Sequence, residues 1–167
     1  LSHEIRTPMN GILGMAELLE DSPLSPAQED YVRTINTSGN NLLKILDDIL
    51  DYSKIETGTM TLDVSSFDIA TMVSECVEMF QQRAEEKGIE LITHIHEELP
   101  FHVKGDPLRI RQVLANIISN AIKFTPPEGT IELGVSLQDK TAKLFVRDTG
   151  PGISKEDQSR LFQTFAQ

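Results

Sequence analysis

The sequence contains a single cysteine and no long apolar run. One cysteine, Cys76, excludes an internal disulfide and is compatible with a reducing compartment. Because Cys76 falls within an apolar helical pattern, we expect a buried packing thiol rather than a nucleophile. No apolar stretch approaches the roughly 20 residues that a membrane-spanning helix needs. The sequence also has no signal peptide, repeat or low-complexity tract.

Positive charge is scarce as well. The 167 residues include 15 Lys and Arg against 26 Asp and Glu, which gives a formal net charge of -11. An acidic surface repels a phosphate backbone, so nucleic acid is excluded as an expected partner. With 39% hydrophobic residues, the chain can bury the core of one domain and a small appendage. We expect a soluble cytoplasmic fragment with no membrane contact of its own, and leave open an anchor elsewhere in the intact protein.

The first third of the chain has the pattern of a helical hairpin. Apolar residues recur every three or four positions from Ile5 to Leu19, which predicts an amphipathic helix. Two prolines and several turn formers between residues 21 and 26 end it. A longer helix follows to about Glu56, where the pair Thr57-Gly58 stops it. Its apolar residues recur at a spacing of seven, which is typical of helices packed at small crossing angles.

Such a hairpin cannot bury apolar stripes on both of its sides. Pairing with a second copy gives a four-helix bundle, so the sequence predicts a homodimer. Folding the hairpin at residues 21–26 brings His3 to about the level of residues 42–49. A polar cluster near the turn is either a solvated face or part of a docking surface for a partner domain. Its members are Asn36, Thr37, Ser38, Asn40 and Asn41.

The remainder of the chain alternates helices and strands. This alternation predicts an α/β sandwich with helices on one face of a mixed sheet. We therefore expect two domains, a dimerising hairpin over residues 1–58 and the sandwich over residues 59–167. The expected strands are Met60–Val64, Glu90–His96, Thr130–Leu137 and Ala142–Val146, and the expected helices are Phe67–Lys87 and Asp106–Phe124.

Three histidines in the second domain do not form a metal motif. His94 and His96 alternate on a predicted strand without a third ligand nearby in sequence, and His102 stands alone. We expect ordinary exposed side chains at all three positions.

A histidine and a carboxylate stand side by side near the start of the first helix. Taken alone, His3 and Glu4 are most simply a solvated pair, and Pro8 loosens the helix after one turn. The whole run from Ser2 to Ile12, however, closely resembles the phospho-acceptor H box of two-component sensor histidine kinases, in the form found in hybrid kinases. The resemblance implies that His3 accepts a phosphoryl group. We expect Glu4 to hold the other ring nitrogen of the imidazole as a hydrogen-bond acceptor. By analogy with the family, Thr7 orients a water for the reverse, phosphatase reaction.

A second motif lies on the helix that Asp106 opens. Asn116 and Asn120 are four residues apart, so both amides project from one side of the helix, with Lys123 one turn further on. Amide oxygens suit Mg²⁺, although such residues are most often simply exposed to solvent. The run from Asn116 to Thr125 resembles the N box of the GHKL ATP-binding fold. The resemblance implies that Asn120 binds Mg²⁺ and that Asn116, Lys123 and Phe124 belong to the nucleotide site.

A third motif, Asp148-Thr149-Gly150-Pro151-Gly152-Ile153, resembles the G1 box of the same fold. The resemblance implies a buried Asp148 carboxylate that accepts a hydrogen bond from the adenine amine. Guanine presents an oxygen at that place, so adenine is favoured. Gly150 and Gly152 allow the backbone to approach the nucleotide. Residues 161–167 resemble the F box that leads into the ATP lid.

The four motifs in this order indicate a sensor histidine kinase. Its implied activity is autophosphorylation of His3 from Mg²⁺-ATP, followed by relay to an aspartate of a response-regulator receiver domain. The second glycine box is expected beyond Gln167, so we expect an incomplete lid and leave open whether the chain as given binds ATP. Two alternatives stay open: a catalytically silent dimeric scaffold (a pseudokinase) and a GHKL ATPase without phosphotransfer.

Overall fold

The computed structural model describes residues 2–96, 102–139 and 141–158, and side chains from residue 4 onward. The chain divides into two compact units, residues 1–61 and 62–167. The sequence predicts this boundary three residues earlier, after Gly58. The assignment of a separate function to each unit stays a prediction.

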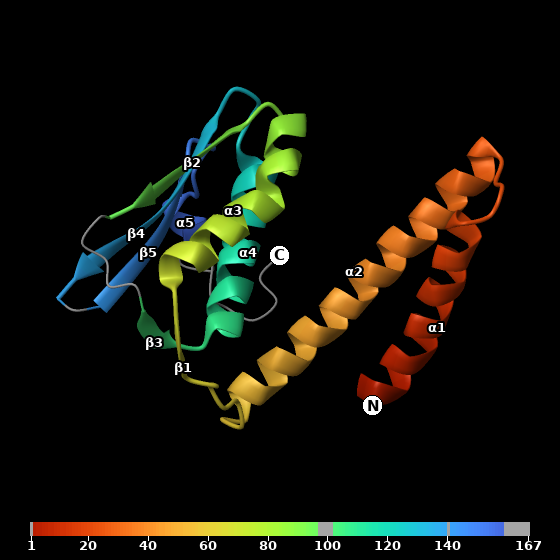
Figure 1. Ribbon diagram of the computed structural model, residues 1–167, viewed down its shortest axis with the longest axis horizontal. Helices are drawn as coiled ribbons and strands as arrows, with labels where there is room; N and C mark the ends of the chain where they lie inside the picture. The colour runs from red at the N-terminus through yellow and green to blue at the C-terminus, as the bar shows by residue number, and fades with distance from the viewer. Residues whose placement is uncertain (1, 97–101, 140, 159–167) are drawn as a thin grey trace. The chain divides into compact units, whose positions relative to one another are not determined.

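The first unit is the predicted helical hairpin (Figure 1). It consists of α1 (Ser2–Glu20) and α2 (Pro26–Glu56), and α1 continues through Pro8. The backbone N–H of Ser25 donates to the Oε1 atom of Gln28 at 2.9 Å, which completes a side-chain cap at the start of α2. Gly58, with a positive φ of 65°, follows the last residues of α2. The predicted helix limits are therefore confirmed.

Contacts between α1 and α2 fix how the two helices face each other. Arg6 pairs with Asp47 at 2.7 Å, and the Nδ2 atom of Asn36 donates to Glu20 at 2.9 Å. Since Arg6 is one turn after residue 3, this pairing agrees with the predicted level of the histidine. Close to the turn, the polar side chains 37, 38, 40 and 41 are exposed, while Asn36 is half-buried.

The hairpin leaves many large apolar side chains exposed. Its interior includes the buried side chains of Leu13, Ala16 and Val32. A single hairpin therefore covers only part of its apolar surface. The exposed residues are Ile5, Ile12, Met15, Leu18, Leu19, Tyr31, Ile35, Leu42, Ile45, Ile49, Tyr52 and Ile55.

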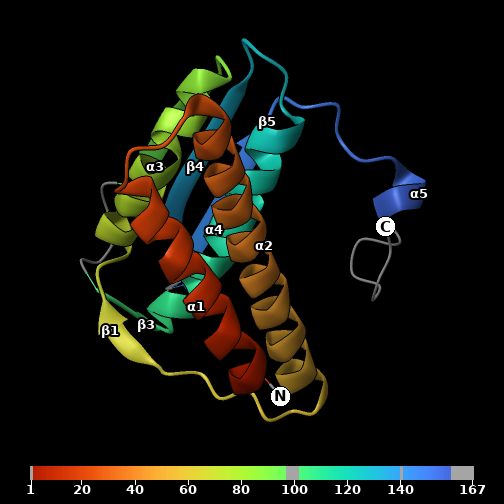
Figure 2. The same cartoon turned by 90° about the vertical axis from the view of Figure 1, so that its right-hand side faces the viewer.

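The second unit is built on a mixed three-stranded sheet. Its strands are β2 (Glu90–Ile95), β4 (Thr130–Gln138) and β5 (Thr141–Asp148), with β4 in the middle. Strand β2 runs parallel to β4, and β5 runs antiparallel to it. Helices α3 (Ile69–Glu86) and α4 (Pro107–Phe124) lie on the same face of the sheet (Figures 1 and 2). The predicted α/β sandwich is confirmed, and a short helix, α5 (Lys155–Gln158), follows β5.

The core lies between the two helices and the middle strand. Ile131, Leu133 and Val135 of β4 alternate toward the helices and are at most 1% exposed. Ile118 and Ile122 of α4 pack into the same cluster, as does Cys76 of α3. Burial raises the pKa of the Cys76 thiol, so this side chain is a packing residue, as predicted.

One predicted strand is wrong. Residues 60–64 form no strand; β1 begins later and covers Ser65–Phe67, where it pairs antiparallel with β3 (Val103–Gly105). The backbone N–H of Asp63 instead donates to the carboxylate of Asp106 at 3.0 Å. Within this segment, Asp63 is therefore bound by the carboxylate that caps α4 and not by a neighbouring strand.

Candidate functional site

The predicted phospho-acceptor lies in the first turn of α1. The backbone of residue 3 is helical there, whereas the side chain of His3 lies outside the described part of the structure. Glu4 and Thr7 are both exposed. Thr7 is four residues after His3, so the two share one face of the helix. Their catalytic roles stay predictions.

Helix α4 presents its amide side chains away from the core. Leu114, Ile118 and Ile122 are buried on the opposite side, and this fixes the rotation of the helix. Asn116 and Asn120 are consequently exposed. The two amide oxygens remain accessible to a hard cation or to a phosphate-bound water shell.

The last turn of α4 is held in place by a lysine from the end of α3. The Nζ atom of Lys87 donates to the carbonyl oxygens of Ile122 at 2.6 Å and of Lys123 at 2.8 Å. A cation at this end also compensates the negative pole of the helix. Nearby, the Nζ atom of Lys123 lies 5.0 Å from the ring centroid of Phe124. Lys123 and Phe124, two of the predicted nucleotide-site residues, therefore belong to an exposed turn that Lys87 binds.

Asp148 is the last residue of β5. It lies opposite Ile131 in the register, so it is on the face of the sheet that the helices cover. Its Oδ1 atom accepts a hydrogen bond from the backbone N–H of Gly150 at 2.8 Å. The carboxylate is exposed, which corrects the predicted burial. The reason is its position at the end of a strand that, among the described residues, pairs only with β4.

The structure brings two of the predicted motifs together. A Cβ atom added at Gly150 would lie 2.6 Å from the Oδ1 atom of Asp148 and 3.4 Å from the carbonyl oxygen of Phe124. The loop after β5 therefore packs against the last turn of α4, and a side chain at residue 150 would disturb that packing. Gly152, with a φ of 73°, occupies a backbone conformation that favours glycine. Asn116 lies eight residues before Phe124, about 12 Å away along the helix axis.

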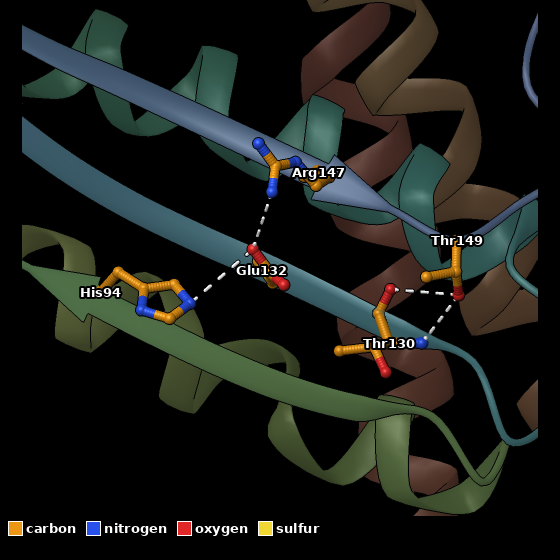
Figure 3. Close-up of polar contacts among 5 residues, drawn as sticks. All are labelled: His94, Thr130, Glu132, Arg147 and Thr149. Carbon is orange, nitrogen blue, oxygen red and sulfur yellow. Dashed lines mark hydrogen bonds and ion pairs between the residues drawn. The ribbon is translucent and has the colours of Figure 1, made fainter.

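One residue of this loop was not singled out from the sequence. Figure 3 shows the hydroxyl of Thr149 directed at the backbone of Thr130, at the start of β4. Both residues lie beside Gly129, where an added Cβ atom would come within 2.9 Å of the Thr149 Oγ1 atom. The signal in the sequence is only the position of Thr149 between an aspartate and a glycine, and it does not reveal the partner.

A separate apolar cavity of about 460 Å³ lies beside α4. Asn116, Asn120 and Asp148 do not line it. Because its walls are mainly apolar side chains, we do not place the polar phosphates of a nucleotide there. The apolar lining residues are Leu62, Ile110, Val113, Leu114, Ile117, Leu144, Phe145 and Val146.

His94, His96 and His102 are exposed, as predicted. Figure 3 shows His94, Glu132 and Arg147 in a row across the three strands. The Nε2 atom of His94 lies 3.7 Å from Glu132, and its ring stacks on Phe145 with centroids 6.4 Å apart. The described residues contain no cluster of three or more His, Cys, Asp or Glu side chains that could bind a metal ion. Among those residues there is also no helix long and apolar enough to cross a membrane.

Protein-family models match the first unit and the C-terminal part of the second. Residues 1–58 match the His Kinase A (phospho-acceptor) domain, and residues 105–167 match the histidine kinase-, DNA gyrase B- and HSP90-like ATPase. The chain therefore belongs to the histidine kinases, with a phospho-acceptor hairpin and an ATPase domain. Within them, its relatives are sensor histidine kinases. The predicted F box, residues 161–167, falls in the matched range but lies outside the described residues.

Three curated histidine kinases are similar over the whole chain. Sensor protein GacS of Pseudomonas syringae pv. syringae is 45% identical over 172 aligned residues, and BarA of Escherichia coli is 41% identical. In both cases the chain is covered completely but spans only 19% of the relative. Hybrid signal transduction histidine kinase L of Dictyostelium discoideum is 44% identical, and the chain spans 10% of it.

Solved structures show the same fold. Full-length ShkA in complex with AMPPNP superimposes with a TM-score of 0.85 at 38% identity, covering 100% of this chain and 36% of that chain. Histidine kinase ThkA in complex with the response regulator TrrA gives a TM-score of 0.66 at 25% identity, covering 99% of this chain and 48% of that chain. The helical hairpin followed by a mixed α/β domain is thus an arrangement shared with other histidine kinases.

Proposed function

We propose that this chain transfers the γ-phosphoryl group of ATP to His3 and then passes it to an aspartate of a response-regulator receiver domain. The observation that carries the proposal is the packing of Gly150 against the last turn of α4, because it joins two separate nucleotide motifs in one unit. The families of the two units support it, as do the nucleotide analogue bound by ShkA and the response regulator bound by ThkA.

The nucleotide would lie along α4. Its adenine amine would donate to the exposed Asp148 carboxylate, next to the glycine that allows close backbone approach. Its phosphates would extend toward Asn116 and Asn120, and the distance of about 12 Å from Phe124 to Asn116 along the helix suits an extended triphosphate nucleotide. Lys123 would balance phosphate charge from the same exposed side of the helix.

Magnesium fits the donor chemistry of this helix. Asn120 is exposed and offers a neutral amide oxygen, a ligand type that Mg²⁺ accepts while it keeps several waters. When bound there with the nucleotide, Mg²⁺ would neutralise part of the negative charge that resists attack on the γ-phosphoryl group.

The chemical step needs a neutral imidazole. A ring nitrogen of His3 forms a bond to the γ-phosphorus as the bond to the β,γ-bridging oxygen breaks, and ADP leaves with that oxygen. Glu4 accepts the hydrogen bond of the other ring nitrogen and stabilises the imidazolium until the proton on that nitrogen passes to solvent water. Thr7 would orient a water for the reverse reaction. Pro8 weakens the helix next to His3 and would permit a bend between the two activities.

We further propose that two copies of the hairpin form a four-helix bundle. The exposed apolar side chains of α1 and α2 give the reason, because a second copy is the smallest partner that covers them symmetrically.

Incubation with labelled Mg²⁺-ATP tests the proposed function. The assay uses a polypeptide that contains this chain with its natural flanking residues, together with His3→Gln, Asn120→Asp and Asp148→Asn. The unmodified protein should acquire an acid-labile, base-stable phosphoryl group, and His3→Gln should acquire none. The other two variants should lose nucleotide affinity. Label that persists in His3→Gln excludes His3 as the phosphorylated residue. Release of ADP without any label on the protein indicates an ATPase without phosphotransfer. Absence of ATP binding indicates a silent scaffold. Loss of label on addition of a receiver domain would report the relay.

A further inference from the structure

Thr149 joins the loop after β5 to the start of β4. Its backbone N–H donates to the carbonyl oxygen of Thr130 at 3.1 Å. Its Oγ1 atom accepts the backbone N–H of Thr130 at 2.9 Å and lies 3.4 Å from the Thr130 carbonyl oxygen, to which it can donate (Figure 3). The hydroxyl therefore uses both its donor and its acceptor within the protein.

These contacts change how the strand pair ends. In an antiparallel ladder, a hydrogen-bonded pair exchanges two backbone bonds, N–H to carbonyl in both directions. Here one of the two goes from the Thr130 N–H to the Thr149 hydroxyl. Because the side chain supplies the acceptor, the carbonyl of Thr149 is not needed for the ladder. The backbone can then turn away toward Gly150 while Asp148 stays in register with Ile131.

The end of α4 and the loop after β5 are closely packed around Gly129. A Cβ atom at Gly129 would lie 2.4 Å from the Cγ2 atom of Thr125 and 2.9 Å from the Oγ1 atom of Thr149. Thr125 is fully buried and directly follows α4. The end of α4 and the loop after β5 thus meet at the same glycine. A shift of Thr149 would move the loop relative to the helix turn that carries Lys123 and Phe124.

We propose that Thr149 is a positioning residue for the nucleotide site. It does not bind the nucleotide; its hydroxyl fixes the turn that places the Asp148 carboxylate and the Gly150 backbone where adenine is recognised. The proposal rests on the proposed function of the same site. It predicts that loss of the hydroxyl weakens the discrimination between adenine and guanine as well as the affinity, because a mobile Asp148 rejects guanine less strongly.

The test compares Thr149→Val, which keeps the shape but removes the hydroxyl, with Thr149→Ser, which keeps the hydroxyl. Thr141→Val is the matched control, since Thr141 is exposed at the first residue of β5, far from the loop that carries Thr149. The polypeptide with its natural flanks is titrated with ATP and with GTP. Thr149→Val should bind ATP about tenfold more weakly, with a smaller preference for ATP over GTP. Thr149→Ser and Thr141→Val should remain within about twofold of the unmodified protein.

Amide hydrogen exchange without nucleotide gives an independent readout. Thr149→Val should accelerate exchange at Thr130 and Gly150, and Thr149→Ser should restore the slow exchange. Unchanged exchange and unchanged ATP affinity in Thr149→Val overturn the positioning role. Equal losses for ATP and GTP, with the preference intact, overturn it too and indicate a purely structural contact. If the unmodified protein binds no ATP while exchange responds as expected, the proposed function is wrong, and the fixed turn itself is supported.

Discussion

The carboxylate of Asp106 binds the backbone of Asp63. Its Oδ2 atom accepts the Asp63 N–H at 3.0 Å, while its Oδ1 atom accepts the N–H of Arg109 at 3.1 Å. One buried side chain therefore caps α4 and holds the first residues of the second unit to the start of that helix. The segment that follows the hairpin is thus fastened to the helix that carries Asn116 and Asn120.

Acid should weaken this connection. The hydrogen bonds from Arg109 and then Asp63 lower the pKa of Asp106 below its ordinary value of 3.8. A carboxyl group with a depressed pKa in the folded state stabilises the fold above its unfolded pKa, and the stabilisation is lost as the pH falls through the folded value. The thermal unfolding midpoint should therefore drop below about pH 4, and Asp106→Asn should flatten this part of the profile.

Asp68→Asn is the matched control for that experiment. Asp68 caps α3, and its pKa is lowered chiefly by one backbone hydrogen bond, from Thr71. Asparagine replaces one carboxylate oxygen by an NH₂ donor, so it can keep the single bond at Asp68 but loses one of the two bonds at Asp106, which are accepted by different oxygens. At neutral pH, Asp106→Asn should consequently lower the unfolding midpoint more than Asp68→Asn. Equal losses in the two variants would show that the bond to Asp63 contributes nothing.

The sequence was most informative where the determinants are local. Asp68 and Asp106 start helices, and Gly58 and Gly88 follow helix ends, because caps and positive φ angles involve only residues within one or two turns. The strand pattern of β4 was equally clear, since its alternation reflects one buried face.

Features that depend on distant partners could not be predicted in the same way. Residues 60–64 alternate like a strand, but the backbone N–H of Asp63 is bound by Asp106, 43 residues later. The exposure of Asp148 depends on what covers the end of β5, and the role of Thr149 depends on Thr130. Motif resemblance indicates which residues contact a ligand, whereas the residues that hold them in place become visible only in the fold.

Gly39→Ala should loosen the hairpin. A Cβ atom at this buried glycine of α2 would lie 2.6 Å from the Cδ2 atom of Leu13, so α1 would have to move or Leu13 to change rotamer. Overpacking of this kind costs about 1–3 kcal/mol, against about 1 kcal/mol gained from the higher helix propensity of alanine. Gly11→Ala is the control, because no atom lies within 4 Å of its added Cβ. Chemical denaturation should place Gly39→Ala at least about 1 kcal/mol below Gly11→Ala, and the reverse order would contradict the packing.

Gly134→Ala should destabilise the sheet. The ring of Phe145 lies across Gly134, where an added Cβ atom would be 2.3 Å from ring carbons and 3.0 Å from the backbone oxygen of His94. We expect a loss of about 2–3 kcal/mol, measured by denaturant unfolding. In a Phe145→Leu background the same change should cost about 1 kcal/mol less, because the leucine side chain is smaller and occupies less of the space above residue 134. An identical cost in both backgrounds would mean that the ring is not the obstacle.

Charge on the exposed apolar seam of α2, which includes Leu42 and Ile49, should weaken self-association. Leu42 and Ile49 are 46% and 55% exposed in the single hairpin, so glutamate at either position costs little there. In a four-helix bundle the same positions would be covered, and a buried carboxylate without a partner is costly. Leu42→Glu and Ile49→Glu should each weaken dimerisation by roughly 100-fold or more, measured by sedimentation over a range of concentrations. Met79→Glu, on α3 and 63% exposed, is the control and should retain the mass of the unmodified protein. If all three variants sediment alike, the seam does not form the dimer interface, and the exposed side chains of α1 must be covered in another way.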